Sequence, residues 1–228
     1  MIYLAIFIAV FLASVFIYVE TKSKPLLAIS LKGLASFGFI VLFSVGVLQV
    51  KTYLSEPTIV ILFSLGLIAG LMGDIYLALR PLRPLQENHQ IILIGTICFA
   101  TGHVFYYIAL LLIGQFSLWA IVISVVITIG TLFASKVLKL NWGPSFTPSV
   151  IYSFLVFLVA GQAIMNGINI GFSGFNVAVI SGTILFGLSD LVLAQIYFGG
   201  KTSNPFIVLN LATYYSAQIL LAFSLYLL

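Results

Sequence analysis

Residues 59–79 read IVILFSLGLIAGLMGDIYLAL, a stretch in which Asp74 is the only charged residue. An α-helix needs about 20 mostly apolar residues to cross a hydrocarbon core of roughly 30 Å. The stretch has that length and that composition, so it predicts a transmembrane helix. The carboxyl group inside it is the starting point for a functional hypothesis, because intramembrane acids are costly and tend to be functional.

The whole chain shares this apolar character. Of its 228 residues, 62% are hydrophobic and 6% are charged, whereas soluble domains carry about 25% charged residues. The sequence therefore predicts an integral membrane protein. The net charge of +4 comes from Lys and Arg scattered between the apolar stretches, so it indicates topology and not a nucleic-acid partner. The single cysteine, Cys98, excludes an intramolecular disulfide and a CxxC site.

Eight apolar stretches follow one another with short links, and unbroken stretches of this length differ from the alternating strands of a membrane barrel. We predict an all-α protein with one polytopic membrane domain over residues 1–228. The predicted spans are Met1–Val19, Leu26–Leu48, Ile59–Leu79, Ile91–Ile113, Phe116–Ala134, Ser149–Met165, Val177–Phe198 and Pro205–Leu228.

Basic residues orient the predicted bundle. The links after spans two, four and six hold only Lys51, and those after the odd-numbered spans hold all the other basic residues outside the spans. These are Lys22, Lys24, Arg80, Arg83, Lys136, Lys139 and Lys201. By the positive-inside rule, the odd-numbered links are expected in the cytoplasm and both termini outside it. We therefore expect a multi-pass protein of a bacterial-type inner membrane.

Two carboxyl groups lie within predicted spans, Asp74 in span three and Asp190 in span seven. At about 1.5 Å per residue, they lie roughly 8 Å and 12 Å from the cytoplasmic ends of their helices. Each follows a face of small residues that includes Gly66, Gly70 and Gly187, and small residues favour close helix packing. We expect both carboxyls to face one shared site near the cytoplasmic side. The alternative is that each is only an interhelical hydrogen-bonding group.

Polar residues of two further spans are expected around the carboxyls. His103 and Tyr107 lie in span four, and Asn210, Tyr214 and Gln218 follow span eight at i, i+4 and i+8. The structural alternative for the stripe in span eight is hydrogen bonding between helices, and for His103 it is a packed core position.

Lys24 and Lys32 lie at the start of span two, at the same end as Arg80 and Arg83. Topology and snorkelling explain any one of these residues. As a group they predict a binding place for a lipid phosphate.

The two halves of the chain show a faint repeat. Asp74 and Asp190 are 116 residues apart, and each lies in the third span of a four-span half. In the span that follows, His103 comes 29 residues after the first aspartate and Gln218 comes 28 residues after the second. This pattern suggests a tandem duplication, with the two halves parallel because four spans return the chain to its starting side.

A buried pair of carboxyls tends to hold one proton between them, which gives one acid and one base. Glycosidases use such a pair on acetal-type oxygens through an oxocarbenium-like transition state. A vinyl ether reacts similarly once its outer alkene carbon is protonated and water adds. Zinc chemistry is not expected, because a catalytic zinc normally needs three protein ligands and the histidines are His103 in a span and His89 in a link between spans. We expect no metal and no cofactor.

Five short motifs then occur in order along the chain. They are Lys24-Pro25-Leu26, Gly73-Asp74, Gly102-His103-x-x-Tyr106, Ser189-Asp190-x-x-Leu193-Ala194 and Tyr214-x-x-Ala217-Gln218. With these motifs the chain resembles the YhhN-type lysoplasmalogenase family of eight-span membrane proteins. The resemblance implies hydrolysis of the vinyl ether bond of a lysophospholipid, the lysoplasmalogen, to a fatty aldehyde and a glycerophospho-alcohol. It maps the family's paired aspartates onto Asp74 and Asp190.

Two other classes of function remain open at this point. A proton-coupled transporter of a small or lipid solute would also combine membrane acids with tandem halves. A membrane scaffold would use both aspartates only to join helices. The Gly66-x-x-x-Gly70 pattern is compatible with packing inside the bundle or between copies in a homo-oligomer.

Overall fold

The computed structural model describes residues 1–22, 25–82 and 88–228, and within these ranges every regular element is a helix. Eight of the helices in the described ranges are long and apolar enough to cross a membrane. They are α1 (Ile2–Glu20), α2 (Pro25–Val50), α4 (Pro57–Ala78), α5 (Asn88–Ile113), α6 (Leu118–Val137), α7 (Phe146–Ile170), α8 (Gly174–Phe198) and α9 (Asn204–Ser224). The predicted all-α, eight-span architecture is confirmed, and the protein is a multi-pass membrane protein.

Three short helical elements accompany the spans: α3 (Thr52–Ser55) and the 3-10 turns Arg80–Leu82 and Gly143–Ser145. The spans differ from the prediction mainly at their ends. The sixth span was predicted over 149–165, but α7 covers Phe146–Ile170. Pro148 lies in its first turn, where a proline removes no helical hydrogen bond. The helix ends at Ile170, and Gly171 follows with a φ of 99°, which glycine adopts without a steric penalty. The last span ends at Ser224 and not at Leu228.

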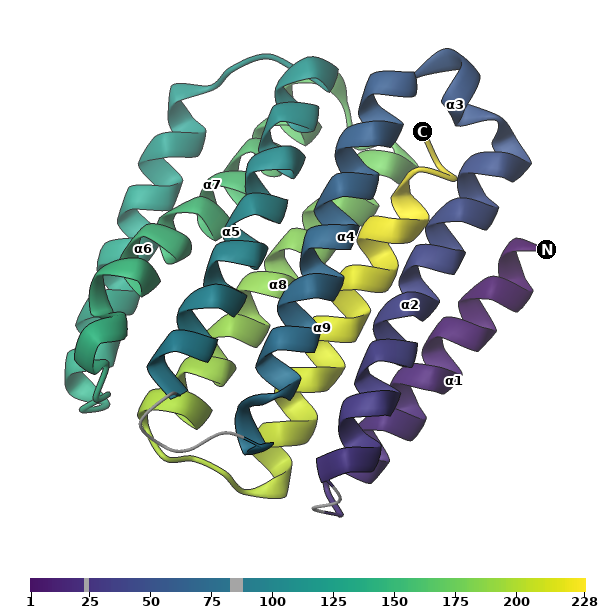
Figure 1. Cartoon of the computed structure of the whole chain (residues 1–228). Helices are drawn as coiled ribbons and strands as arrows, with labels where there is room; N and C mark the ends of the chain where they lie inside the picture. The colour runs from purple at the N-terminus through teal and green to yellow at the C-terminus, as the bar shows by residue number, and fades with distance from the viewer. Residues whose placement is uncertain (23–24, 83–87) are drawn as a thin grey trace.

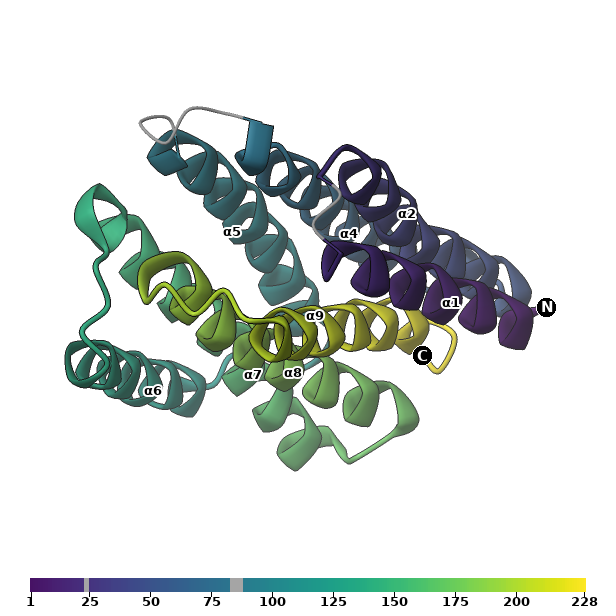
Figure 2. The same ribbon diagram turned by 90° about the horizontal axis from the view of Figure 1, so that it is seen from below.

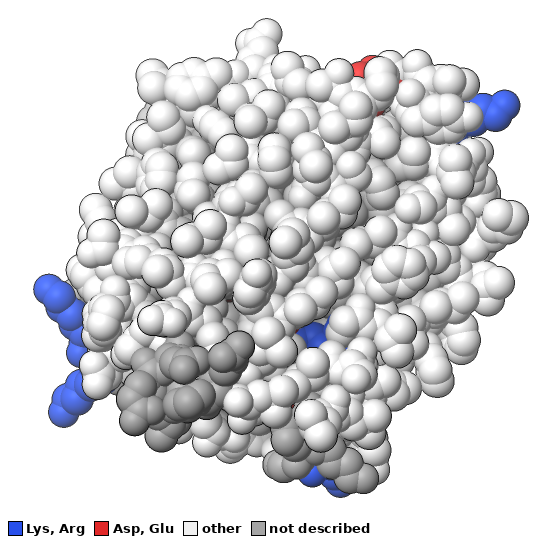
Figure 3. All heavy atoms as spheres, viewed as in Figure 1, with Lys and Arg blue, Asp and Glu red and all other residues white. Residues whose placement is uncertain are grey.

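The helices are apolar around their whole circumference because they face protein on one side and lipid on the other. Figure 3 shows the result: most of the visible Lys and Arg side chains lie at the edges, one blue patch lies in a hollow of the lower half, and the rest of this face is almost free of charge. In Figure 1 both chain ends lie toward the upper side of the bundle, while α2, α5, α7 and α9 begin at the lower side. The described basic residues Lys22, Arg80 and Lys201 therefore share the lower rim. That this rim is cytoplasmic remains a prediction.

The two halves of the bundle repeat the same packing order. In the first half α1 packs on α2, α2 on α4 and α4 on α5; in the second, α6 packs on α7, α7 on α8 and α8 on α9. Two equivalent contacts join the halves, α2 with α9 and α5 with α7. The contact of α1 with α9 lacks an equivalent of similar size, because α6 makes little contact with α5 and lies apart from it in Figure 2.

The small residues predicted to favour close packing are used inside the bundle. A Cβ atom added at Gly66 would collide with the ring of Tyr106 on α5, and one added at Gly70 would lie 2.8 Å from Nε2 of Gln218 on α9. The pattern therefore serves contacts of α4 within one chain. Close packing also joins α6 to α7, where a Cβ at Gly161 would lie 2.9 Å from the carbonyl oxygen of Ala120.

Candidate active site

Asp74 on α4 is buried and held by three donors from two other helices. The hydroxyls of Ser36 on α2 and Tyr214 on α9 each donate to Oδ2, both at 2.6 Å. Nζ of Lys32, one turn before Ser36 on α2, lies 3.4 Å from Oδ1. The Lys32 side chain is 13% exposed and that of Asp74 is 3% exposed. A carboxyl surrounded by a cation and two hydroxyl donors is in the setting that suits its ionised form.

A second layer holds these donors in place. Nε2 of Gln218 donates to the hydroxyl of Tyr214 at 3.0 Å, and the hydroxyls of Ser36 and Tyr215 lie 3.3 Å apart. Gln218 can come this close to α4 because position 70 is glycine. The stripe predicted on span eight thus reaches the first aspartate, with Tyr214 in direct contact and Gln218 behind it.

Asp190 on α8 has a simpler setting. The hydroxyl of Tyr152 on α7 donates to its Oδ2 at 2.8 Å, and among the described residues no other side chain donates to it. The side chain is partly exposed. Nδ2 of Asn210 donates to the carbonyl oxygen of Ser189 at 2.8 Å, which joins α9 to the turn of α8 that carries Asp190. Asp190 therefore meets one neutral donor where Asp74 meets three donors.

Both aspartates line one cavity of about 460 Å³ between α1, α2, α4, α8 and α9. Lys32, Asn210 and Tyr214 also line it. The lower end of this cavity is bordered by Glu20, at the end of α1, and Arg80, just after α4. The guanidinium of Arg80 lies 4.2 Å from the centre of the Tyr197 ring, a cation–π contact that holds the cation at the mouth. The described residues contain no group of three His, Cys, Asp or Glu side chains placed to hold a metal ion.

Other predicted site residues lie elsewhere. His103 is buried, its Nδ1 is 2.9 Å from the Phe99 carbonyl oxygen one turn earlier, and its ring packs on Phe186 with centroids 4.6 Å apart. The residues that line the cavity include neither His103 nor Tyr107. His103 is connected to the site only through packing: the centroids of its ring and the Tyr152 ring lie 5.8 Å apart. Lys24 lies outside the described residues.

The structure adds three residues that the sequence did not single out, Ser36, Tyr152 and Tyr215. Two of them follow the repeat: Ser36 precedes Asp74 by 38 residues, and Tyr152 precedes Asp190 by 38. The same 116-residue offset that relates the aspartates therefore relates their hydroxyl donors. Continuing the helix face of Lys32 by one turn would have pointed to Ser36, and adding the 116-residue offset to Ser36 would then have pointed to Tyr152.

The fold and the site define a class of protein: an eight-span membrane protein in which two acids from separate helices face one cavity near one rim. The sequence model of the YhhN family matches residues 27–225, and the chain belongs to the YhhN family. The family resemblance drawn from the motifs is thereby confirmed. No curated protein and no solved structure matches the chain.

Proposed function

We propose that this protein is a membrane hydrolase that cleaves the vinyl ether bond of lysoplasmalogens, with Asp190 as the proton donor and Asp74 as the permanent carboxylate. The observation that carries the proposal is that Asp74 and Asp190 line the same cavity. The family resemblance suggests the reaction, and the unequal settings of the two carboxyls suggest which one carries which role.

In the proposed reaction, Asp190 donates its proton to the outer alkene carbon of the vinyl ether. The positive charge that develops on the carbon–oxygen unit is an oxocarbenium ion, and the ionised Asp74 stabilises it across the cavity. Water then adds to the cationic carbon and returns a proton to Asp190. The resulting hemiacetal collapses to an aldehyde and an alcohol, so one water is consumed and the enzyme is regenerated. Tyr152 positions Asp190 through its hydrogen bond of 2.8 Å.

The mouth of the cavity suits a charged headgroup. Lys32 and Arg80 provide positive charge for a phosphate, and Glu20 provides negative charge beside them. Arginine and lysine are the usual phosphate-binding residues. A phosphate that carries an amine, as in an ethanolamine headgroup, would satisfy both signs of charge. Lys32 would then contact the substrate while still holding Asp74.

The proposal is tested by incubating the purified protein with lysoplasmenyl-ethanolamine and measuring aldehyde and glycerophospho-alcohol by mass spectrometry. Asp74→Asn and Asp190→Asn should each abolish aldehyde release while the proteins remain folded. Glu56→Gln is the matched control, because Glu56 is an exposed carboxylate at the other end of α4 and its change should leave the rate unaltered. Full activity of either aspartate variant would end the mechanism.

The transporter alternative gains no specific support. The aspartate helices α4 and α8 are continuous over Pro57–Ala78 and Gly174–Phe198, whereas substrate sites of secondary transporters are typically built on broken helices. Uptake of intact lysolipid into proteoliposomes, with no aldehyde formed, would favour transport.

We also propose that the mouth of the cavity faces the cytoplasm, by the positive-inside rule. The test uses Lys51→Cys and Lys201→Cys in a Cys98→Ala background, where each new thiol is the only one in the chain. A membrane-impermeant maleimide applied to intact cells should label position 51 and reach position 201 only after permeabilisation. The reverse pattern would invert the orientation.

A further inference from the structure

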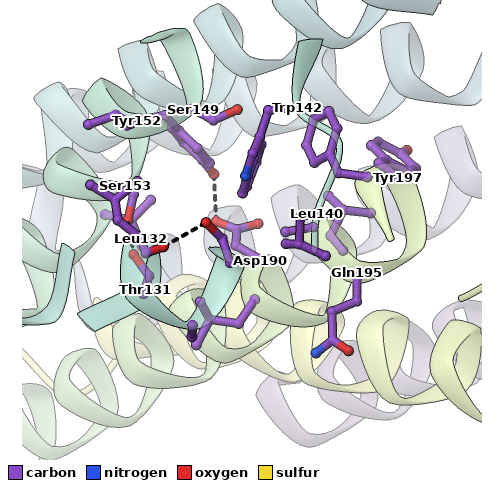
Figure 4. Close-up of a pocket in the computed structure, with 18 of the residues that line it drawn as sticks. Thr131, Leu132, Leu140, Trp142, Ser149, Tyr152, Ser153, Asp190, Gln195 and Tyr197 are labelled. Carbon is purple, nitrogen blue, oxygen red and sulfur yellow. Dashed lines mark hydrogen bonds between the residues drawn. The ribbon is translucent and has the colours of Figure 1, made fainter. Parts of the chain in front are cut away.

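A second cavity, of about 490 Å³, lies on the other side of Asp190, between α5, α6, α7 and α8. Figure 4 looks into it, with Asp190 and Tyr152 on its wall. The proposed reaction at the first cavity does not account for it. Its volume falls within the roughly 300–1,000 Å³ that small-molecule sites occupy.

The wall of this second cavity consists mostly of carbon. Its aliphatic and aromatic members include Ile127, Val156 and Phe157. Two hydroxyls on the wall donate to backbone carbonyl oxygens of their own helix. Thr131 donates to the Thr128 oxygen at 2.8 Å, and Ser135 donates to the Leu132 oxygen at 2.8 Å. The hydrogens of these two hydroxyls are therefore used within α6. A wall of this kind favours a hydrocarbon ligand.

The two cavities share a wall. Leu77, Phe99, Asp190, Leu193 and Tyr197 line both of them. Asp190 is the only acid among the described residues that line the second cavity, whereas the first contains Glu20, Lys32, Asp74 and Arg80 as well. A ligand that placed a reactive group at Asp190 would therefore have its charged end on one side and an apolar end on the other.

The cavities also correspond to each other in the repeat. The first is lined by α1, α2, α4, α8 and α9, and the second mainly by α5, α6, α7 and α8. In the repeat, α1, α2, α4 and α9 correspond to α6, α7, α8 and α5. Residues of both α5 and α6 line the second cavity, and these two helices stand apart in Figure 2. The equivalent contact, between α1 and α9, is made. The two halves have thus formed one charged cavity and one apolar cavity.

We infer that the apolar cavity binds the single hydrocarbon chain of the substrate, entering beside α6, while the charged cavity holds its headgroup. The inference rests on the proposed function, because a vinyl ether lies at the junction of chain and headgroup and would then lie at Asp190. The apolar cavity would then be the site that selects lipids with one chain. A lipid with two chains would place its second chain in the charged cavity, where burying it would strip Lys32 and Arg80 of solvent.

The test measures binding without catalysis. Trp142 lines the apolar cavity, and the only other tryptophan, Trp119, is 65% exposed at the start of α6. A Trp119→Phe protein in nanodiscs therefore reports on Trp142 alone. The probe is an ester-linked lysophosphatidylethanolamine whose chain carries bromine, which quenches tryptophan on contact and has no vinyl ether to cleave. We expect saturable quenching that an unbrominated lysolipid reverses.

Two glycine variants supply the matched comparison. Gly130 lines the cavity and a Cβ there would meet open space, so Gly130→Phe should fill it; Gly33 on α2 also has open space but lines neither cavity. Gly130→Phe should raise the half-saturation concentration of the probe at least about tenfold, equivalent to about 1.4 kcal/mol of lost binding free energy. Gly33→Phe should leave it unchanged.

The outcomes separate the two proposals. Non-saturable quenching, or equal saturable quenching by a brominated two-chain lipid of the nanodisc, would overturn the chain site, as would an effect of Gly33→Phe equal to that of Gly130→Phe. Aldehyde release by a protein that shows no saturable quenching would leave the hydrolase standing and remove the chain site. Saturable quenching in a protein that releases no aldehyde would support the chain site and remove the reaction.

Discussion

Replacing Lys32 by Met should destabilise the protein through the charge that it leaves behind. The cation and the Asp74 carboxylate lie 3.4 Å apart, with side chains only 13% and 3% exposed. Removing one partner of a buried ion pair costs about 3–5 kcal/mol, because the other charge is left without compensation. Ser36 and Tyr214 still donate to Asp74 at 2.6 Å in the variant. We therefore expect a loss at the lower end, about 3 kcal/mol.

The double variant Lys32→Met, Asp74→Asn isolates the charge interaction. An asparagine at position 74 carries no charge, so the methionine no longer leaves an unpaired anion. The double variant should lose about 2 kcal/mol less than the sum of the two single variants, since groups in contact do not contribute additively. Lys201→Met is the control: Lys201 is exposed, and its replacement should change stability by no more than about 0.5 kcal/mol.

The assay is reversible unfolding in mixed micelles, with a rising fraction of sodium dodecyl sulfate and helicity followed by circular dichroism. Strict additivity of the single variants would refute the reasoning, because it would mean that the two charges do not stabilise each other. A loss for Lys201→Met as large as that for Lys32→Met would assign the effect to net charge and not to the pair.

Two further predictions concern single contacts. Tyr152→Phe removes the hydroxyl that donates to Asp190 at 2.8 Å. It should lower kcat for aldehyde release by about 10- to 100-fold, an effect of the size expected for a supporting hydrogen bond, and leave KM little changed. Tyr107→Phe changes a tyrosine outside both cavities and should retain the parent kcat; an equal loss in both variants would point to general misfolding. Gly161→Ala places a methyl group 2.9 Å from the Ala120 carbonyl oxygen. Because this methyl forces α6 away from α7, the free energy of unfolding should fall by about 1–3 kcal/mol in the same assay. Unchanged stability would show that these helices can separate freely.

The number and order of the spans could be predicted because a bilayer core accepts only long apolar helices. The ends were less predictable, since α7 continues past 149–165 through Asn166 and Asn169, and local features such as the positive φ of Gly171 stop the helix. Asp74 and Asp190 were predictable for a different reason. A charge in an apolar span is rare enough that its position alone indicates a site.

The neighbours of the carboxyls were harder to predict because hydroxyls and aromatic rings are common in membrane helices. Only the repeat separates Tyr152, which donates to Asp190, from Tyr107, which lines neither cavity. His103 shows the limit for polar residues: its Nδ1 is satisfied by the Phe99 carbonyl of its own helix, so depth in the membrane does not determine what a side chain contacts. Helix rotation decides these cases, and it depends on the packing of the whole bundle.

The equal distance of 38 residues between each aspartate and its hydroxyl donor has a consequence for how this protein could change. Two identical four-helix chains assembled as a dimer would be obliged to carry the same side chain at both symmetry-related positions. In a single polypeptide the two positions mutate independently, and the position that is a serine at 36 in the first half is a tyrosine at 152 in the second. Selection can therefore change the hydroxyl donor of one aspartate and leave that of the other aspartate intact.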